Sequence, residues 1–146
     1  MGRLLTASKQ KCSLVHRWVM LRFLTEMETV MSKIVLITGT STGIGKAAAL
    51  HFARAGYSVF ASMRNPDNGA ELLDLAKQES LRLSVVKHDV CDPLSNQAAV
   101  DQVIAAAGQI DVLVNNAGIA GGGAFEETPE AELRSVMETN FFGAID

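Results

Sequence analysis

The stretch TGTSTGIG, Thr38 to Gly45, places three glycines directly after the apolar run KIVLI. An uninterrupted aliphatic run of this length is typical of a buried strand, and the residues that follow have a helical periodicity. A glycine-rich turn from strand to helix leaves the first N–H groups of the helix open to a phosphate group. Glycine-containing turns of this kind also occur in unrelated proteins, so the motif needs support from the rest of the chain.

Strand and helix patterns alternate from residue 33 to the end of the chain. The expected strands are 33–38, 57–62, 81–88 and 110–114, and the expected helices are 43–56, 69–79, 95–108 and a last one opening at 128–130. This alternation predicts right-handed βαβ units and a doubly wound parallel sheet. The expected fold is α/β of the Rossmann type, with only its first four strands and their helices. In that fold strands one and four are neighbours, and ligands bind beyond their carboxyl ends.

Side chains near the helix ends allow more local predictions. Gly56 is expected to end the first helix, and Thr128 to cap the last one ahead of a proline at its first position. The inward face of the first helix is expected to consist of Ile44, Ala48, Phe52 and Ala55.

The composition favours one globular domain in a reducing, cytoplasmic compartment. The chain has 146 residues, of which 48% are hydrophobic, and a net charge of −3. Cys12 and Cys91 are far apart and belong to no Cys/His cluster, so the sequence predicts neither a disulfide nor a metal site. No cluster of Lys and Arg follows residue 30, which argues against nucleic acid as a partner.

Residues 1–30 differ from the rest of the chain in charge. Their net charge is +3, which leaves −6 for the remainder because the whole chain carries −3. The apolar run 14–24 is interrupted by two arginines and is too short to span a bilayer. We predict that residues 1–30 are an extension outside the core, and that 31–146 form the N-terminal part of a nucleotide-binding domain. Two origins of the extension stay open: a targeting segment in residues 1–25, or sequence upstream of a natural start at Met31.

A second motif, NNAG from Asn115 to Gly118, follows the fourth expected strand. It stands where strands one and four meet in the doubly wound order, beside TGTSTGIG. Together with Asn140 in the next helix, these motifs resemble the short-chain dehydrogenase/reductase family, in the expected order over residues 33–146. The resemblance implies a nicotinamide cofactor and a small alcohol or ketone as substrate. The stretch ASMRNP is similar, more weakly, to the steroid- and retinol-type branch of that family.

The binding residues come partly from geometry and partly from the resemblance. Gly39 would allow the turn, Gly43 would let the phosphates approach, and Gly45 would let the helix pack on the strand. The resemblance implies phosphate contacts from Ser41, Thr42 and Ile44, an adenine site at Asp89 and Val90, and an adenosine side formed by Asn115, Asn116, Ala117 and Gly118. Structural roles are the alternatives: Asp89 could cap the helix after Pro93, and Ser41 and Thr42 could be N-caps.

The end of the second expected strand indicates which nicotinamide cofactor is bound. Family members that prefer NAD carry an Asp there, which accepts hydrogen bonds from the adenosine ribose and repels a 2′-phosphate. This chain has Met63 at that place and Arg64 next to it. A guanidinium suits a phosphate monoester, so we predict NADP rather than NAD. The alternative is that Arg64 is an ordinary solvated side chain.

The catalytic residues of the family are mostly missing from this sequence. The family uses a Ser to polarise the carbonyl, a Tyr-x-x-x-Lys motif for proton transfer and an Asn to complete the relay, and only Asn140 has a counterpart here. The sole tyrosine, Tyr57, is followed four residues on by Ala61 rather than Lys. The chain ends at Asp146, before the fifth strand of the family's sheet.

Two functions therefore stay open at this stage. The first is the N-terminal part of an NADP-dependent oxidoreductase, inactive as given, that acts on a secondary alcohol or ketone and is a homo-oligomer when complete. The second is a non-catalytic nucleotide-binding or regulatory module. The identity of the substrate is not specified by these residues. The glycines at 121–123 either border the substrate side or form a flexible connector.

Overall fold

The computed structural model describes residues 32–145, so the predictions for residues 1–30 lie outside the described residues. The chain divides into two compact units, Met1–Ser32 and Lys33–Asp146. The fold described below belongs to the second unit. No helix within residues 32–145 combines the length and the apolar character needed to cross a bilayer.

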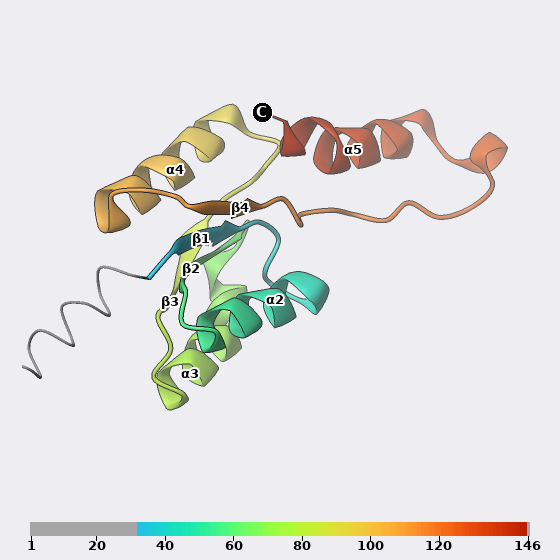
Figure 1. Ribbon diagram of the computed structural model, residues 1–146. Coiled ribbons are helices and arrows are strands. Elements are labelled where there is room, and N and C mark those ends of the chain that lie inside the picture. Colours follow the sequence, from blue (N-terminus) through green and yellow to red (C-terminus); the bar gives the residue numbers. More distant parts are fainter. Residues whose placement is uncertain (1–31, 146) are drawn as a thin grey trace, which may run out of the picture. The chain divides into compact units, whose positions relative to one another are not determined.

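Four parallel strands form the sheet (Figure 1). They are β1 (Ile34–Ile37), β2 (Ser58–Met63), β3 (Leu83–Lys87) and β4 (Val112–Val114), in the order β3-β2-β1-β4. β1 pairs in parallel with β2 on one side and with β4 on the other, so Val35 lies between Val59 and Val112. The predicted doubly wound parallel sheet, with strands one and four adjacent, is confirmed.

Helices cover the two faces of this sheet. The α-helices are α2 (Gly43–Arg54), α3 (Ala70–Gln78), α4 (Pro93–Ala107) and α5 (Glu130–Asn140), and the short 3₁₀ helices are η1 (Pro66–Gly69), η2 (Phe125–Glu127) and η3 (Phe142–Ala144). Figure 1 shows α2 and α3 together below the sheet and α4 above it. α2, α3 and α4 each connect two parallel strands, as a crossover connection requires, whereas α5 follows β4.

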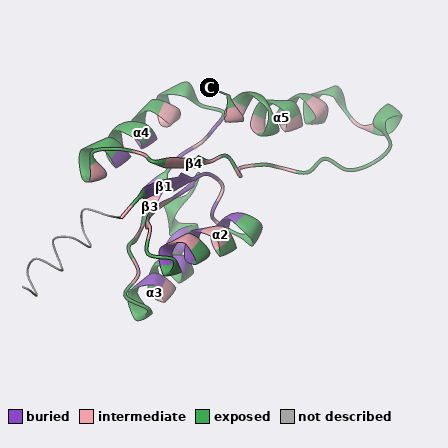
Figure 2. Ribbon diagram, in the orientation of Figure 1, coloured by how far each residue is buried: buried purple, intermediate pink, exposed green. Residues whose placement is uncertain are grey.

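The alternation of side chains along β1 divides the core into two layers. Val35 and Ile37 pack with α2 and α3, in the cluster that contains Leu50 and Leu72. Ile34 and Leu36 point the other way, into the cluster that contains Val103 of α4. Because both faces are covered, β1 needs an apolar residue at every position, which explains the uninterrupted run in the sequence. Figure 2 shows this buried centre and the largely exposed surface of α5, in which no residue is buried.

The face of α2 that packs on the sheet matches the prediction only in part, since Ala48 and Phe52 pack against the core as expected. Ile44 is 82% exposed, and Ala55 is exposed as well, whereas the buried residues of this helix are Gly45, Ala49, Leu50 and Ala53. Small residues spaced four apart let the helix lie close to the strands, and the bulky Ile44 is turned outward by the same rotation. Gly56 follows the helix with a φ of 91°, as expected of a glycine that ends a helix.

The start of α4 and the cap of α5 differ from the predictions. α4 begins at Pro93, two residues earlier than expected, and Asp92 caps it by accepting a hydrogen bond of 3.0 Å from the N–H of Leu94. At α5 the N-cap position is Pro129, and no side chain caps that helix. The hydroxyl of Thr128 instead donates to the carbonyl of Ala124 at 2.9 Å and so closes the preceding 3₁₀ turn.

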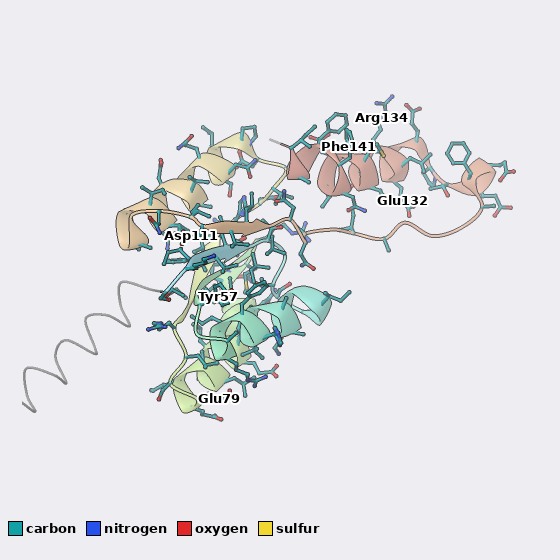
Figure 3. The ribbon with its side chains drawn as sticks, in the orientation of Figure 1. Tyr57, Glu79, Asp111, Glu132, Arg134 and Phe141 are labelled. Carbon is teal, nitrogen blue, oxygen red and sulfur yellow. The ribbon has the colours of Figure 1, made fainter. Side chains whose placement is uncertain are left out.

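β4 lies at one edge of the sheet and is fixed at its start by Asp111. The carboxylate oxygen Oδ2 of Asp111 accepts from the N–H of Ile34 at 2.6 Å, and the N–H of Asp111 donates to the carbonyl of Ile34 at 2.9 Å. Figure 3 labels Asp111 at the beginning of these strands. This reciprocal pair sets the register of β4, which consists of three residues only.

Candidate functional site

A cavity of about 320 Å³ opens where the carboxyl ends of the strands meet the N-terminus of α2. Its size is within the range of pockets that bind small ligands. Of the residues predicted to bind a cofactor, those that line it are Gly39, Ser41, Thr42, Ile44, Gly45, Arg64, Asp89, Val90, Asn116, Ala117 and Gly118. Gly43 and Asn115 do not line the cavity. The fold thus brings together segments that are up to about eighty residues apart in the chain.

The three glycines of the turn are required for different physical reasons. Gly39 has a φ of 68°, and a Cβ atom there would lie 2.6 Å from the Cα of Ala117. A Cβ on Gly45 would collide with the carbonyl oxygen of Gly39 and with the side-chain amide of Asn116. Gly43 has a φ of 59° but faces open space, with no atom within 4 Å of the position of a Cβ. Gly43 therefore keeps the approach to the helix N-terminus clear.

The N-terminus of α2 is suited to an anion. Thr42 occupies the N-cap position with extended backbone angles, yet no side chain of the described residues caps the helix. The first turn contains no acidic residue that would compete with an anion for its N–H groups. A helix start of this kind binds phosphate through backbone donors and the positive end of the dipole. The alternative that the hydroxyl of Thr42 serves as the cap is therefore wrong.

Asn116 connects the NNAG motif to the TGTSTGIG turn by hydrogen bonds. Its amide nitrogen Nδ2 donates to the carbonyls of Thr38 at 2.9 Å and Gly39 at 3.0 Å. The hydroxyl oxygen of Thr38 in turn accepts from the N–H groups of Asn116 at 3.0 Å and Ala117 at 2.9 Å. These reciprocal bonds hold the ends of β1 and β4 together, so the wall formed by NNAG is rigid relative to the glycine turn.

The remaining asparagines serve the segment that follows β4. Asn115 donates from Nδ2 to the carbonyl of Ala144 at 3.0 Å. Asn140, the one predicted catalytic residue, does not line the cavity. Its side-chain amide accepts from the N–H of Ile119 at 2.8 Å and donates to the carbonyl of Ile119 at 2.8 Å. With both ends of the amide engaged, the side chain of Asn140 orders the backbone beside the cavity.

The rim of the cavity at the end of β2 carries a positive charge. Met63 is the last residue of β2 and is 2% exposed, whereas Arg64 directly after it is exposed. Both residues line the cavity, and Asp89 is the single acidic residue of its lining within the described part of the chain. The carboxylate of Asp89 accepts from the N–H of Cys91 at 3.1 Å, so it closes a local turn and does not cap α4.

Sequence reasoning did not anticipate four of the residues that line the cavity, and it singled out Met63 only as the residue beside Arg64. The four are His88, Cys91, Ile119 and Thr139. His88 and Cys91 could have been found from their positions on either side of Asp89 and Val90, at the end of the third expected strand. Thr139 precedes Asn140 and reaches the cavity because the end of α5 returns to this edge, where the hydroxyl of Thr139 lies 3.4 Å from the sulfur of Cys91.

Ionisable groups elsewhere form surface pairs. Arg54 makes two hydrogen bonds of 2.7 and 2.6 Å to the carboxylate of Glu79, which joins the ends of α2 and α3. Figure 3 labels Glu79. These hydrogen bonds lower the pKa of Glu79 and raise that of Arg54. Across residues 32–145 no group of three or more His, Cys, Asp or Glu side chains is placed to hold a metal ion.

Comparison with known proteins identifies the family. Residues 33–146 match the family model described as short chain dehydrogenase, so the chain belongs to the short-chain dehydrogenase family. Proteins of this family bind a nicotinamide cofactor and act on small molecules.

Two curated relatives illustrate the range of the family. A 3-ketodihydrosphingosine reductase of Bacteroides thetaiotaomicron is 40% identical over 114 residues, which cover 78% of this chain and 39% of that protein. The 11-beta-hydroxysteroid dehydrogenase A of Arachis hypogaea is 38% identical over 120 residues, which cover 81% of this chain and 34% of that protein. The weaker resemblance to a steroid-type branch is thereby supported. The chain spans less than half the length of these relatives.

Solved structures confirm the fold and include cofactor complexes. A gluconate 5-dehydrogenase of Burkholderia cenocepacia in complex with NADP and tartrate has a TM-score of 0.70 at 32% identity, over 76% of this chain and 44% of that one. The F189W variant of the actinorhodin polyketide ketoreductase with NADPH has a TM-score of 0.74 at 32% identity, over 78% of this chain and 44% of that one. The described fold thus corresponds to the N-terminal portion of these enzymes.

Proposed function

We propose that the chain is the N-terminal, cofactor-binding part of an NADP-dependent oxidoreductase that interconverts a secondary alcohol and a ketone. The observation that carries this proposal is the cavity at the uncapped start of α2, which Arg64 borders at the end of β2. The names of the similar proteins, which include reductases and dehydrogenases, support the class of reaction. When bound, the nicotinamide cofactor supplies or accepts the hydride.

The residues of the cavity fit such a cofactor in a definite orientation. The open N–H groups at Thr42, Gly43 and Ile44 suit the pyrophosphate, because backbone donors and the helix dipole need no lysine there. Asp89 and Val90 would hold the adenine. The adenosine side would be completed by Asn115, Asn116, Ala117 and Gly118.

Arg64 is the basis for proposing NADP rather than NAD. It lines the cavity beside Met63, where an NAD-binding site would place a carboxylate. A guanidinium there would pair with a 2′-phosphate through charge-assisted hydrogen bonds. The two solved relatives that contain NADP or NADPH are consistent with this choice.

Asn140 would act in the proton relay through the segment that it orders. Its amide is bonded to Ile119, which lines the cavity. The sequence contains no Tyr-x-x-x-Lys motif, so the chain holds no tyrosine in the position that transfers the proton in this family. The same feature favours a second candidate, a nucleotide-binding module without turnover. We further propose a cytoplasmic location and a homo-oligomer for the complete enzyme.

The test is direct measurement of cofactor binding. The protein is titrated with NADPH and NADH by calorimetry. We expect NADPH to bind more tightly than NADH. Equal affinity for NADPH and NADH would contradict the assignment of Arg64, and no binding of either would contradict the proposed function as a whole.

A further inference from the structure

His88 is a buried histidine at the edge of the cavity that the expected cofactor contacts do not include. It follows β3 directly, is 8% exposed and continues the sheet by donating its backbone N–H to the carbonyl of Met63 at 2.9 Å. Burial of an imidazole is unfavourable unless its nitrogens are hydrogen-bonded. An apolar residue would fill this position at a lower desolvation free energy, so the hydrogen bonds of the imidazole ring indicate a specific role.

Both ring nitrogens of His88 have partners on different elements. Nδ1 lies 2.9 Å from the hydroxyl oxygen of Ser62 on β2. Nε2 lies 2.8 Å from Oδ1 of Asn96 on α4. The ring therefore joins the middle of the sheet to the helix that follows the adenine side of the cavity.

The direction of these bonds follows from the far end of Asn96. Its Nδ2 donates to the carbonyl of Val90 at 3.4 Å, so Oδ1 must face His88 as an acceptor. In the neutral imidazole, Nε2 of His88 therefore carries the proton, and Nδ1 accepts from the hydroxyl of Ser62. The carbonyl of Ser62 accepts from the hydroxyl of Thr40 at 3.0 Å, which extends the network to the glycine turn. No buried side-chain nitrogen or oxygen among residues 32–145 lacks a partner.

This network ends on the backbone that forms one wall of the cavity. Asn96 holds the carbonyl of Val90, and Ser95 accepts from the N–H of Asp89 at 2.9 Å. Asp89 and Val90 both line the cavity. A buried network in which every group is satisfied favours one arrangement over its alternatives.

We propose that His88 is a positioning residue that holds the Asp89–Val90 wall in place for the adenosine half of the cofactor, by joining Ser62 of β2 to Asn96 of α4. The proposal rests on the proposed function, since it concerns the same site. His88 acts through Val90 and does not itself touch the reacting atoms. Protein molecules in which the Asp89–Val90 wall is displaced do not bind the cofactor. The apparent affinity therefore falls in proportion to the fraction of molecules that can still bind.

The experiment compares His88→Phe with the unmodified protein. The probes are NADPH, NADH and adenosine 2′,5′-bisphosphate, which lacks the nicotinamide half. We expect all three to bind about tenfold more weakly, because phenylalanine leaves the Ser62 hydroxyl and the Asn96 oxygen without their partner. The preference for NADPH over NADH should not change, since Arg64 is untouched. Ser84→Ala, an exposed position on the same strand, is the matched control and should bind as the unmodified protein does.

Two conservative variants distinguish a positioning role of the His88 side chain from a role that only fills space. The amide of glutamine reaches the place of Nε2, so His88→Gln keeps the bond to Asn96 and should recover most of the affinity. The shorter asparagine reaches the place of Nδ1, so His88→Asn keeps only the contact with Ser62 and should bind as weakly as His88→Phe. Equal recovery by both variants would contradict the proposal, because a filler of space does not distinguish the two nitrogens.

A second variant covers the case in which His88→Phe fails to fold. Asn96→Ala places a good helix former in α4 and removes the bond to Val90, so it should weaken adenosine 2′,5′-bisphosphate about as much as His88→Phe. If the unmodified protein binds none of the probes, the proposed function is wrong. If it binds them and both His88→Phe and Asn96→Ala bind equally well, the role of His88 is wrong and the proposed function stands.

Discussion

Gly143 and Val90 are in direct contact, although 53 residues separate them in the sequence. A methyl group on Gly143 would lie 2.8 Å from Cγ2 of Val90 and 3.0 Å from its carbonyl oxygen. Val90 lines the cavity, and Gly143 belongs to η3, which follows α5. η3 therefore packs against Val90 of the proposed adenine wall, so a change at Gly143 should alter the position of Val90.

Substitution of Gly143 tests this contact. Gly143→Ala adds one methyl group against Val90, and the resulting displacement should weaken NADPH binding by about 1 kcal/mol, or about fivefold. Gly122→Ala is the matched control, because no atom lies within 4 Å of its added methyl group. Both variants are measured by calorimetry. Unchanged affinity in Gly143→Ala would show that the wall adjusts without cost.

Arg64→Ala tests the preference for NADP. Loss of a charge-assisted pair with the 2′-phosphate should cost about 1.5–3 kcal/mol in NADPH affinity and leave NADH affinity nearly the same. Arg134→Ala is the control, because Arg134 pairs with Glu130 on the exposed surface of α5 (Figure 3). If Arg64→Ala weakens both cofactors alike, Arg64 does not select between them.

Replacement by alanine should have different effects at Gly45 and at Gly43 of the glycine turn. Gly45→Ala brings a methyl group into the carbonyl of Gly39 and the amide of Asn116, so the free energy of unfolding should fall by about 1–3 kcal/mol. Gly43→Ala meets no atom, so the left-handed backbone should cost only about 1 kcal/mol. Gly43→Ala should nevertheless lose NADPH affinity, because its methyl group stands at the open helix start. Urea unfolding and calorimetry together measure both effects, and a larger loss of stability in Gly43→Ala would contradict this reading.

The strands and their order were predictable because apolar periodicity and a short glycine turn are local signals. β1 is buried on both faces and so contains only aliphatic residues, and its partner β4 follows from the order of a doubly wound sheet. Apolar spacing predicted the packing face of α2 only in part. Ala48 and Phe52 pack on the core, but Ile44 lies at the outer side of a helix whose buried residues are mostly small.

The residues of the candidate site also divide into those that the sequence predicted and those that it did not. Most residues of the two motifs line the cavity, but Gly43 and Asn115 do not. His88 and Thr139 were missed because their roles depend on contacts between distant elements. The position of His88 beside Asp89 could be read from the sequence, but its contacts with Ser62 and Asn96 could not.

Deletion of residues 1–30 tests the proposed limits of the domain. The described strands and helices all belong to Lys33–Asp146, and β1 begins at Ile34. We expect the melting temperature to change by less than about 2 °C, which for a domain of this size is well below 1 kcal/mol. NADPH affinity should also be retained. A loss of several degrees would show that the segment packs on the domain.

The last prediction concerns turnover by the 146-residue chain itself. Its sequence contains no Tyr-x-x-x-Lys motif, which transfers the proton in this family, so we expect that a panel of ketones will not oxidise NADPH above background. Binding should also be weak, because β4 is an edge strand whose Leu113 is 56% exposed. An apolar edge of this kind favours association, which light scattering would detect. A longer chain that supplies the missing motif and a neighbour for β4 should be active and less prone to associate. Measurable NADPH oxidation by the 146 residues alone would mean that another group transfers the proton.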